Sequence, residues 1–88
     1  MNPSIDMFVY QGTVCANAEG IDWITDLALT PDQELGPIKR TGVTTNFQDF
    51  DATKLPEGAV VYTVHGRGDI LLVRTGDLTL PYLEVVEG

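Results

Sequence analysis

The sequence predicts a mainly β protein, a small single-domain barrel or sandwich of five to six short strands with one short helical turn near residues 31-35. Short runs of β-branched and aromatic residues are separated by turn residues at intervals of roughly ten residues, which is typical of small barrels and sandwiches. The chain has 88 residues, enough for one modest core that buries about 60 to 65% of the unfolded surface. We therefore expect residues 1-88 to form a single compact β-domain.

The clearest element is the stretch from Ala59 to Arg74. Two runs of β-forming residues, Val60 to His65 and Ile70 to Arg74, flank the loop Gly66-Arg67-Gly68-Asp69, a composition typical of a β-hairpin. Both runs place large apolar residues on both faces, so both faces are expected to be covered. This hairpin should therefore lie inside the sheet and not at its edge.

Two segments precede the hairpin in the N-terminal third of the chain. Met7 to Ala16 is the expected first strand, and Gly12 within it indicates a bulge or a close backbone approach. Ile21 to Leu29 fits a helix with Ile21, Ile24 and Ala28 on one face, and it also fits a strand with every second residue from Trp23 on one side. Because the segment is short, we favour extended structure.

The expected helical turn follows directly, from Pro31 to Leu35. Thr30 is a good N-cap, Pro31 suits the first helical position, and Gln33 completes a capping box. Gly36 and Pro37 would end this turn.

The remaining strands are shorter. Val43 to Phe47 is a candidate strand, and Thr75-Gly76-Asp77 is a tight turn. Leu78 to Leu80 and Tyr82 to Val86 form the last strand or two pieces of it, interrupted by Pro81. Since proline cannot donate to a ladder, this strand is expected at a sheet edge or a bulge.

The charge balance limits the partners. Thirteen acidic residues against five basic ones give a net charge of −8, which disfavours direct nucleic-acid binding and binding to anionic membranes. Basic protein surfaces are favoured partners. The N-terminus has no signal-peptide pattern, and no apolar run is long enough to span a membrane. With Cys15 as the only cysteine, we expect a protein made in the cytoplasm without an intrachain disulfide.

Catalytic chemistry has little support in the sequence. His65 and Cys15 are the only His and Cys, and nothing around either residue indicates a nucleophile-base pair. Asp49, Asp51 and Thr53 match the D-x-D-x-T pattern of haloacid-dehalogenase-type phosphatases, but only over five residues, and 88 residues cannot hold the large α/β domain of those enzymes. Turn capping is the simpler interpretation of these side chains. The acids are dispersed and form no calcium loop, so we expect no enzyme, no cofactor and no metal.

Surface residues are the remaining candidates for function. Arg67-Gly68-Asp69 is the triplet that integrins read on hairpin tips, but a plain turn is the simpler interpretation, and Arg67 is a candidate contact if the tip protrudes. The candidate partner contacts are Trp23, Arg67, Asp69 and Tyr82, together with edge strands at Met7 to Val14 or Tyr82 to Val86.

These observations favour a non-enzymatic structural or protein-binding module, as a homo-oligomer or as an accessory component of a larger assembly. The assembly we have in mind is a virus particle, in which the chain would play a part analogous to that of phage decoration or connector proteins. The alternative is a small acidic inhibitor that occupies a basic nucleic-acid-binding surface of a target protein, with Asp22, Asp26, Asp32 and Glu34 as its acidic stripe.

Overall fold

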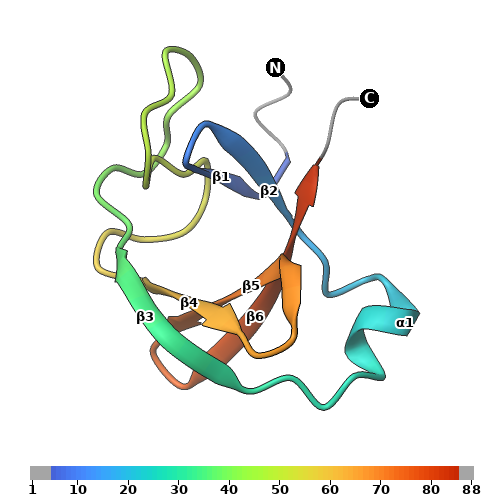
Figure 1. The fold of residues 1–88 in the computed structure, drawn as a ribbon. Coiled ribbons are helices and arrows are strands. Elements are labelled where there is room, and N and C mark those ends of the chain that lie inside the picture. Colours follow the sequence, from blue (N-terminus) through green and yellow to red (C-terminus); the bar gives the residue numbers. More distant parts are fainter. Residues whose placement is uncertain (1–4, 86–88) are drawn as a thin grey trace.

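The structure is a computed structural model that describes residues 5–85. Within this range, six antiparallel strands form a curled half-barrel with one short helical turn (Figure 1). The elements are β1 (Met7–Tyr10), β2 (Thr13–Asn17), α1 (Asp22–Thr25), β3 (Pro31–Pro37), β4 (Val60–Val64), β5 (Arg67–Thr75) and β6 (Leu78–Val85). The predicted mainly β class is confirmed, as is a content of six strands and one helical turn.

The strand order is β1-β2-β6-β5-β4-β3. The central hairpin, β4 and β5, therefore lies inside the sheet as predicted. Two-residue turns join β1 to β2, β4 to β5 and β5 to β6. In the first of these turns, Gln11 and Gly12 both have positive φ, 51° and 74°, which matches the twist of paired strands. The expected first strand is therefore a hairpin, and Gly12 belongs to its turn and not to a bulge.

Two apolar clusters lie on opposite faces of β5. On the inner face of the half-barrel, Leu71 and Val73 pack with a cluster that includes Phe8 and Tyr82. On the outer face, Ile70 and Leu72 pack with Ile24 of α1, together with Ala18 and Val64. This double burial explains why β5 lacks the alternation of a half-exposed strand.

The helical turn lies at α1 and not at Pro31 to Leu35, so both sequence predictions for this region were wrong. Ile24 is fully buried against the sheet, with Ile21 packed beside it, whereas Asp22 and Asp26 are exposed. This apolar contact stabilises a helical turn between residues 22 and 25. The capping-box signal at Pro31 does not prevail, because β4 pairs with this segment along β3.

The predicted strand at Val43 to Phe47 is also wrong, since this segment has no strand in the structure. It belongs to a long connection, residues 38–59, between β3 and β4. Within the segment, the Val43 N–H makes a backbone hydrogen bond to the carbonyl of Ala52. The Thr44–Asn46 stretch is exposed and has no neighbouring strand with which to pair.

The 38–59 connection bridges the two ends of the sheet. Its Lys39 N–H donates to the carbonyl of Phe50, and the Phe50 N–H donates to the carbonyl of Val9 in β1, over 2.9 and 2.7 Å. The Val9 N–H in turn donates to the carbonyl of Asp51. The outer edge of β1 is therefore covered by this connection and is not a free docking edge along these residues.

The last strand differs from its prediction. β6 runs without interruption from Leu78 to Val85 and pairs on both sides, with β2 and with β5, so it is not an edge strand. Pro81 is tolerated because its carbonyl accepts from the Ala18 N–H just beyond the end of β2. In an antiparallel strand the N and the carbonyl of one residue point to the same side. The N of Pro81 therefore faces the side of β2 at a position where β2 has already ended, and no ladder hydrogen bond of β2 is lost. Val86, the predicted end of the strand, lies outside the described residues.

Candidate functional site

An ion pair fixes Arg67 at the start of β5. Arg67 and Asp69 are two residues apart on a strand, so their side chains project on the same side. Arg67 Nε donates to Asp69 Oδ1 at 3.1 Å, and Nη2 donates to Oδ2 at 2.9 Å. These hydrogen bonds hold the pKa of the Asp69 carboxyl below its usual value, against the opposing effect of desolvation. Both side chains remain partly exposed, at 37% and 48%.

The same guanidinium lies over the ring of Trp23. Arg67 Cζ is 5.2 Å from the ring centroid, within the range of a cation–π contact. Trp23 is 49% exposed because its neighbour Ile24 takes the buried position of α1. The structure thus brings together Trp23, Arg67 and Asp69, three of the four contacts proposed from the sequence, and we call this group the Trp23 surface.

The triplet Arg67-Gly68-Asp69 is not the tip of a protruding loop. The predicted four-residue loop is a two-residue turn, His65-Gly66, and the triplet begins β5. Its two charged side chains are hydrogen-bonded to each other. The arrangement that integrins read, with both charges extended from a hairpin tip, is therefore absent from this part of the described chain.

Tyr82, the fourth candidate partner contact, does not lie on the surface of the structure. Its side chain is fully buried and packs edge-to-face on Phe8, with ring centroids 5.1 Å apart. The hydroxyl donates to Asp6 Oδ1 at 2.9 Å. Burial and the nearby Asp6 carboxylate both raise the pKa of the phenol. Tyr82 points inward because it shares the inner face of the sheet with its partner Leu71 on β5.

The D-x-D-x-T residues make structural hydrogen bonds. Asp49 Oδ1 accepts from the Gly12 N–H, and the Thr53 hydroxyl accepts from the Met7 N–H. Asp51 is 2% exposed, accepts from the Gln48 N–H and forms an ion pair with Arg40. Turn capping, predicted for the aspartates, is confirmed for Asp51.

Cys15 and His65 lie in different environments. Cys15 is fully buried on β2, where burial and, to a smaller extent, the charge of Glu84 raise the pKa of its thiol to about 12. A thiol with this pKa is a poor nucleophile at neutral pH. His65 is exposed in the turn between β4 and β5.

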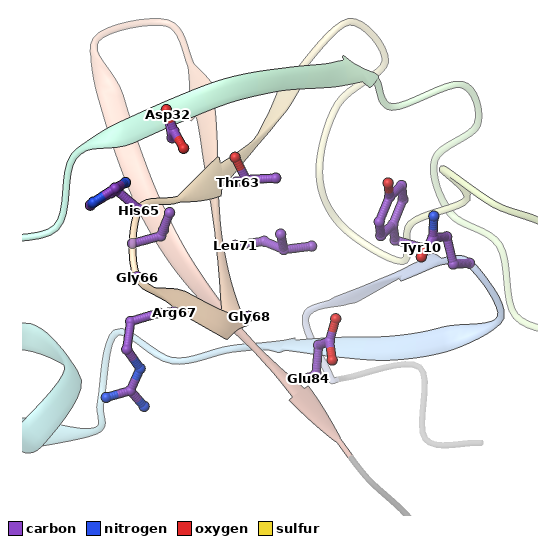
Figure 2. Close-up of a pocket in the computed structure, with 11 residues that line it drawn as sticks. Tyr10, Asp32, Thr63, His65, Gly66, Arg67, Gly68, Leu71 and Glu84 are labelled. Carbon is purple, nitrogen blue, oxygen red and sulfur yellow. The ribbon is translucent and has the colours of Figure 1, made fainter.

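An open depression lies where the half-barrel does not close, and we call it the seam. It has a volume of about 450 Å³ and is lined by residues of β1, β3, β4, β5 and β6 and of the β1–β2 and β4–β5 turns. Figure 2 shows Asp32 on β3 and Glu84 on β6 at opposite sides of the seam, with Leu71 between them and Tyr10 at one end. Of the residues that line the seam, only Arg67 was among the four candidate partner contacts predicted from the sequence. The available signal was Glu84, which has the same inward register as Tyr82 and so places a carboxylate on the apolar face of a strand.

No protein family, no curated protein and no solved structure is found to match the chain. Within residues 5–85, no group of three or more His, Cys, Asp or Glu side chains is arranged to hold a metal ion. The helical part of the described chain also contains no helix that is long and apolar enough to cross a membrane.

Proposed function

We propose that the chain is a non-enzymatic protein-binding module that docks through the Trp23 surface. The observation that carries this proposal is a tryptophan that is half exposed yet held in place by a fixed arginine. Trp and Arg are the residue types most enriched among the side chains that dominate binding energy at protein interfaces.

The Trp23 surface is organised before any partner arrives. Arg67 is held by two hydrogen bonds to Asp69, and its guanidinium in turn limits the motion of the Trp23 ring. Side chains that are already ordered lose less conformational entropy on binding, so more of their contact energy contributes to affinity. Leu27, which is 37% exposed four residues after Trp23, adds apolar area on the same segment.

The partner we favour is a larger protein assembly in which the chain is an accessory component, as phage decoration or connector proteins are in a virus particle. A second copy of the chain is the other occupant of the Trp23 surface. The small size of the chain and its net charge of −8 suit a soluble component that is made in the cytoplasm and recruited to a basic partner surface.

The acidic inhibitor is the second candidate function. Four acidic residues of α1, β3 and the segment between them are all exposed: Asp22, Asp26, Asp32 and Glu34. A row of carboxylates on successive elements can occupy a groove that normally holds phosphates. Such binding weakens steeply with salt, whereas docking by the Trp23 surface depends mainly on apolar and stacking contacts.

The test is site-specific photocrosslinking in the source cells. The photoreactive residue p-benzoylphenylalanine replaces Trp23 in one variant and the exposed Leu78 at the start of β6 in a matched control. We expect a discrete crosslinked product from position 23 and not from position 78. Mass spectrometry then distinguishes a larger partner from a second copy of the chain. Identical products from both positions, or none from position 23, would contradict the proposal.

Salt dependence separates the two candidate functions once the crosslinked partner has been purified. Affinity that changes little between about 50 and 500 mM salt, a range over which the screening of exposed charges increases strongly, supports docking by the Trp23 surface. A steep loss of affinity with salt favours the acidic inhibitor only where Trp23→Ala leaves the affinity unchanged, because attraction to a basic partner surface also weakens with salt.

A further inference from the structure

The seam exposes part of the inner face of the half-barrel. Its floor is formed by Leu71 of β5 and Thr63 of β4, which are direct partners across the two strands. β3 forms one wall, and Tyr10 forms the end near the β1–β2 turn (Figure 2). Tyr10 is held edge-to-face on Phe50, with ring centroids 5.6 Å apart. The floor of the seam is therefore apolar at Leu71, which is 4% exposed, and polar at Thr63, whose hydroxyl accepts from the Gln33 N–H. Its aromatic end, Tyr10, is fixed by packing.

The charges that point into the seam are negative. Glu84 is opposite Cys15, which is fully buried, so its carboxylate projects from the inner face of β6. In Figure 2 the Glu84 side chain extends toward Leu71, and Asp32 points from β3 toward Thr63. Neither carboxylate belongs to an ion pair among residues 5–85.

The two basic side chains at the rim do not neutralise these acids. Arg67 extends away from the floor toward α1, and its guanidinium is already bonded to Asp69 (Figure 2). His65 also points outward from the turn. The seam is thus a cavity of about 450 Å³, within the range of roughly 300 to 1,000 Å³ typical of ligand sites, whose two carboxylates have no ion-pair partner among the described residues.

We infer that the seam receives an arginine or lysine side chain from an extended segment of the protein partner. The apolar stem of such a side chain would lie on Leu71 and against the Tyr10 ring, while the cationic head would lie between Asp32 and Glu84. Long basic side chains combine an apolar stem and a charged head in this way. The inference rests on the proposed function, because it specifies the chemistry that the partner presents beside the Trp23 surface.

The seam is tested with a defined peptide and the full chain. A blocked pentapeptide, Gly-Ser-Arg-Ser-Gly, is titrated into the ¹⁵N-labelled protein, and backbone amide shifts are followed by NMR. We expect saturable shifts at Thr63, Leu71 and Glu84. The same peptide with glutamine in place of arginine should give no saturable shift at these positions, because it has the shape but lacks the charge.

A charge-matched pair of variants separates a specific site from general attraction to an acidic protein. The double substitution Asp32→Asn with Glu84→Gln should weaken peptide binding at least tenfold. The control, Asp22→Asn with Asp77→Asn, makes the same change in net charge at exposed positions outside the seam and should change affinity less than twofold. If the double variant does not fold, Asp32→Asn alone serves, because Asp32 is exposed, and it should weaken binding at least threefold.

Several outcomes would overturn the inference. These are equal losses in both double variants, shifts spread over the whole acidic surface, equal binding of the glutamine peptide, or equal binding of a free polyamine. The result is independent of the crosslinking at position 23. A peptide that binds the seam while position 23 captures nothing contradicts the proposed function, and a partner captured at position 23 with no peptide in the seam contradicts this inference alone.

Discussion

The guanidinium of Arg40 donates hydrogen bonds to the buried carboxylate of Asp51 and so joins two segments of the 38–59 connection. The bond from Arg40 Nε to Asp51 Oδ1 is 2.9 Å, and Asp51 Oδ2 also accepts from the Gln48 N–H at 2.8 Å. Among the described residues, Asp51 is the buried charged residue, with 2% exposure. The Arg40 side chain, in contrast, is 54% exposed. The side-chain contact is therefore internal to the connection, whereas the backbone carbonyl of Asp51 accepts from the Val9 N–H of β1.

We expect Asp51→Asn to lower the free energy of unfolding by about 1 to 3 kcal/mol, because a neutral amide leaves part of this buried hydrogen-bond set unsatisfied. Urea denaturation at pH 7 measures the change. The control is Asp77→Asn in the exposed β5–β6 turn, which should stay within about 0.5 kcal/mol of the original chain. Equal effects of the two substitutions would show that Asp51 has no special structural role.

The same contact predicts how stability depends on acid. The hydrogen bonds from Arg40 lower the pKa of Asp51 in the folded state from its usual value of 3.8. The unfolded chain therefore binds more protons in acid, so this contribution is complete above the usual value and is lost as the pH falls through the lower, folded value. We expect the urea concentration at the unfolding midpoint to decrease as the pH is lowered under about 4. This decrease should be less steep in Asp51→Asn. Parallel acid profiles of the two chains would contradict this assignment.

The sequence was a good guide where local pattern and tertiary packing agree. Apolar residues on both faces of the Ala59 to Arg74 stretch placed the central hairpin inside the sheet, and the Thr75-Gly76-Asp77 turn was also found. The pattern was misleading at Thr30 to Gln33, where a good helix start is overridden by pairing with β4. Capping signals are local, and each is worth only about 1 kcal/mol, so a neighbouring strand can override them.

The candidate site was only partly predictable for a related reason. Trp23, Arg67 and Asp69 are prominent residue types in the sequence, but only the fold brings α1 beside the start of β5. Tyr82 is equally prominent, but its burial depends on the register of β6 in the sheet. The short strands and the internal Pro81 do not allow this register to be predicted from the sequence. The seam depends on Asp32 and Glu84, which come from strands that are not neighbours in the sheet. The register of Glu84 with Tyr82 was a local signal for one of them, and no local pattern pairs it with Asp32.

Tyr82→Phe isolates the hydroxyl that reaches Asp6. The substitution keeps the ring on Phe8 and removes one hydrogen bond to a carboxylate, so we expect a loss of about 1 to 3 kcal/mol in the free energy of unfolding. The raised pKa of Tyr82 means that its contribution is present below the usual phenol value of 10.0 and is lost at higher pH. Stability that falls above about pH 10 in the original chain, and falls less in Tyr82→Phe, would support this; identical alkaline profiles would oppose it.

Cys15 should report on unfolding. Its thiol is buried and has a pKa of about 12, so very little reactive thiolate exists at pH 8 in the folded protein. We expect reaction with a disulfide reagent to be at least 100-fold slower in the folded chain than in urea, on the order expected from burial and thiolate fraction. Rapid labelling of the native protein would mean that β2 opens readily from β6.

Arg67→Ala should loosen the Trp23 surface without unfolding the protein. Trp23 is the single tryptophan, so its fluorescence reports directly on the stacked ring. We expect greater quenching by acrylamide and a change of less than about 1 kcal/mol in stability, as is usual for exposed pairs and cation–π contacts. The control, Arg74→Ala, removes an exposed arginine from the same strand. Quenching that is the same in both variants would show that the stacking does not order Trp23.

The pairing of β2 with β6 also affects how the protein is made. Val14 in the first hairpin is aligned with Val85 near the far end of the described chain. The β1–β2 hairpin therefore leaves the ribosome while its partner strand has not yet been synthesised, and an isolated hairpin is at best marginally stable. A sheet that depends on such distant pairing is expected to fold slowly, over milliseconds to seconds. Until β6 arrives, the apolar faces of β2 and β5 remain accessible to chaperones and proteases.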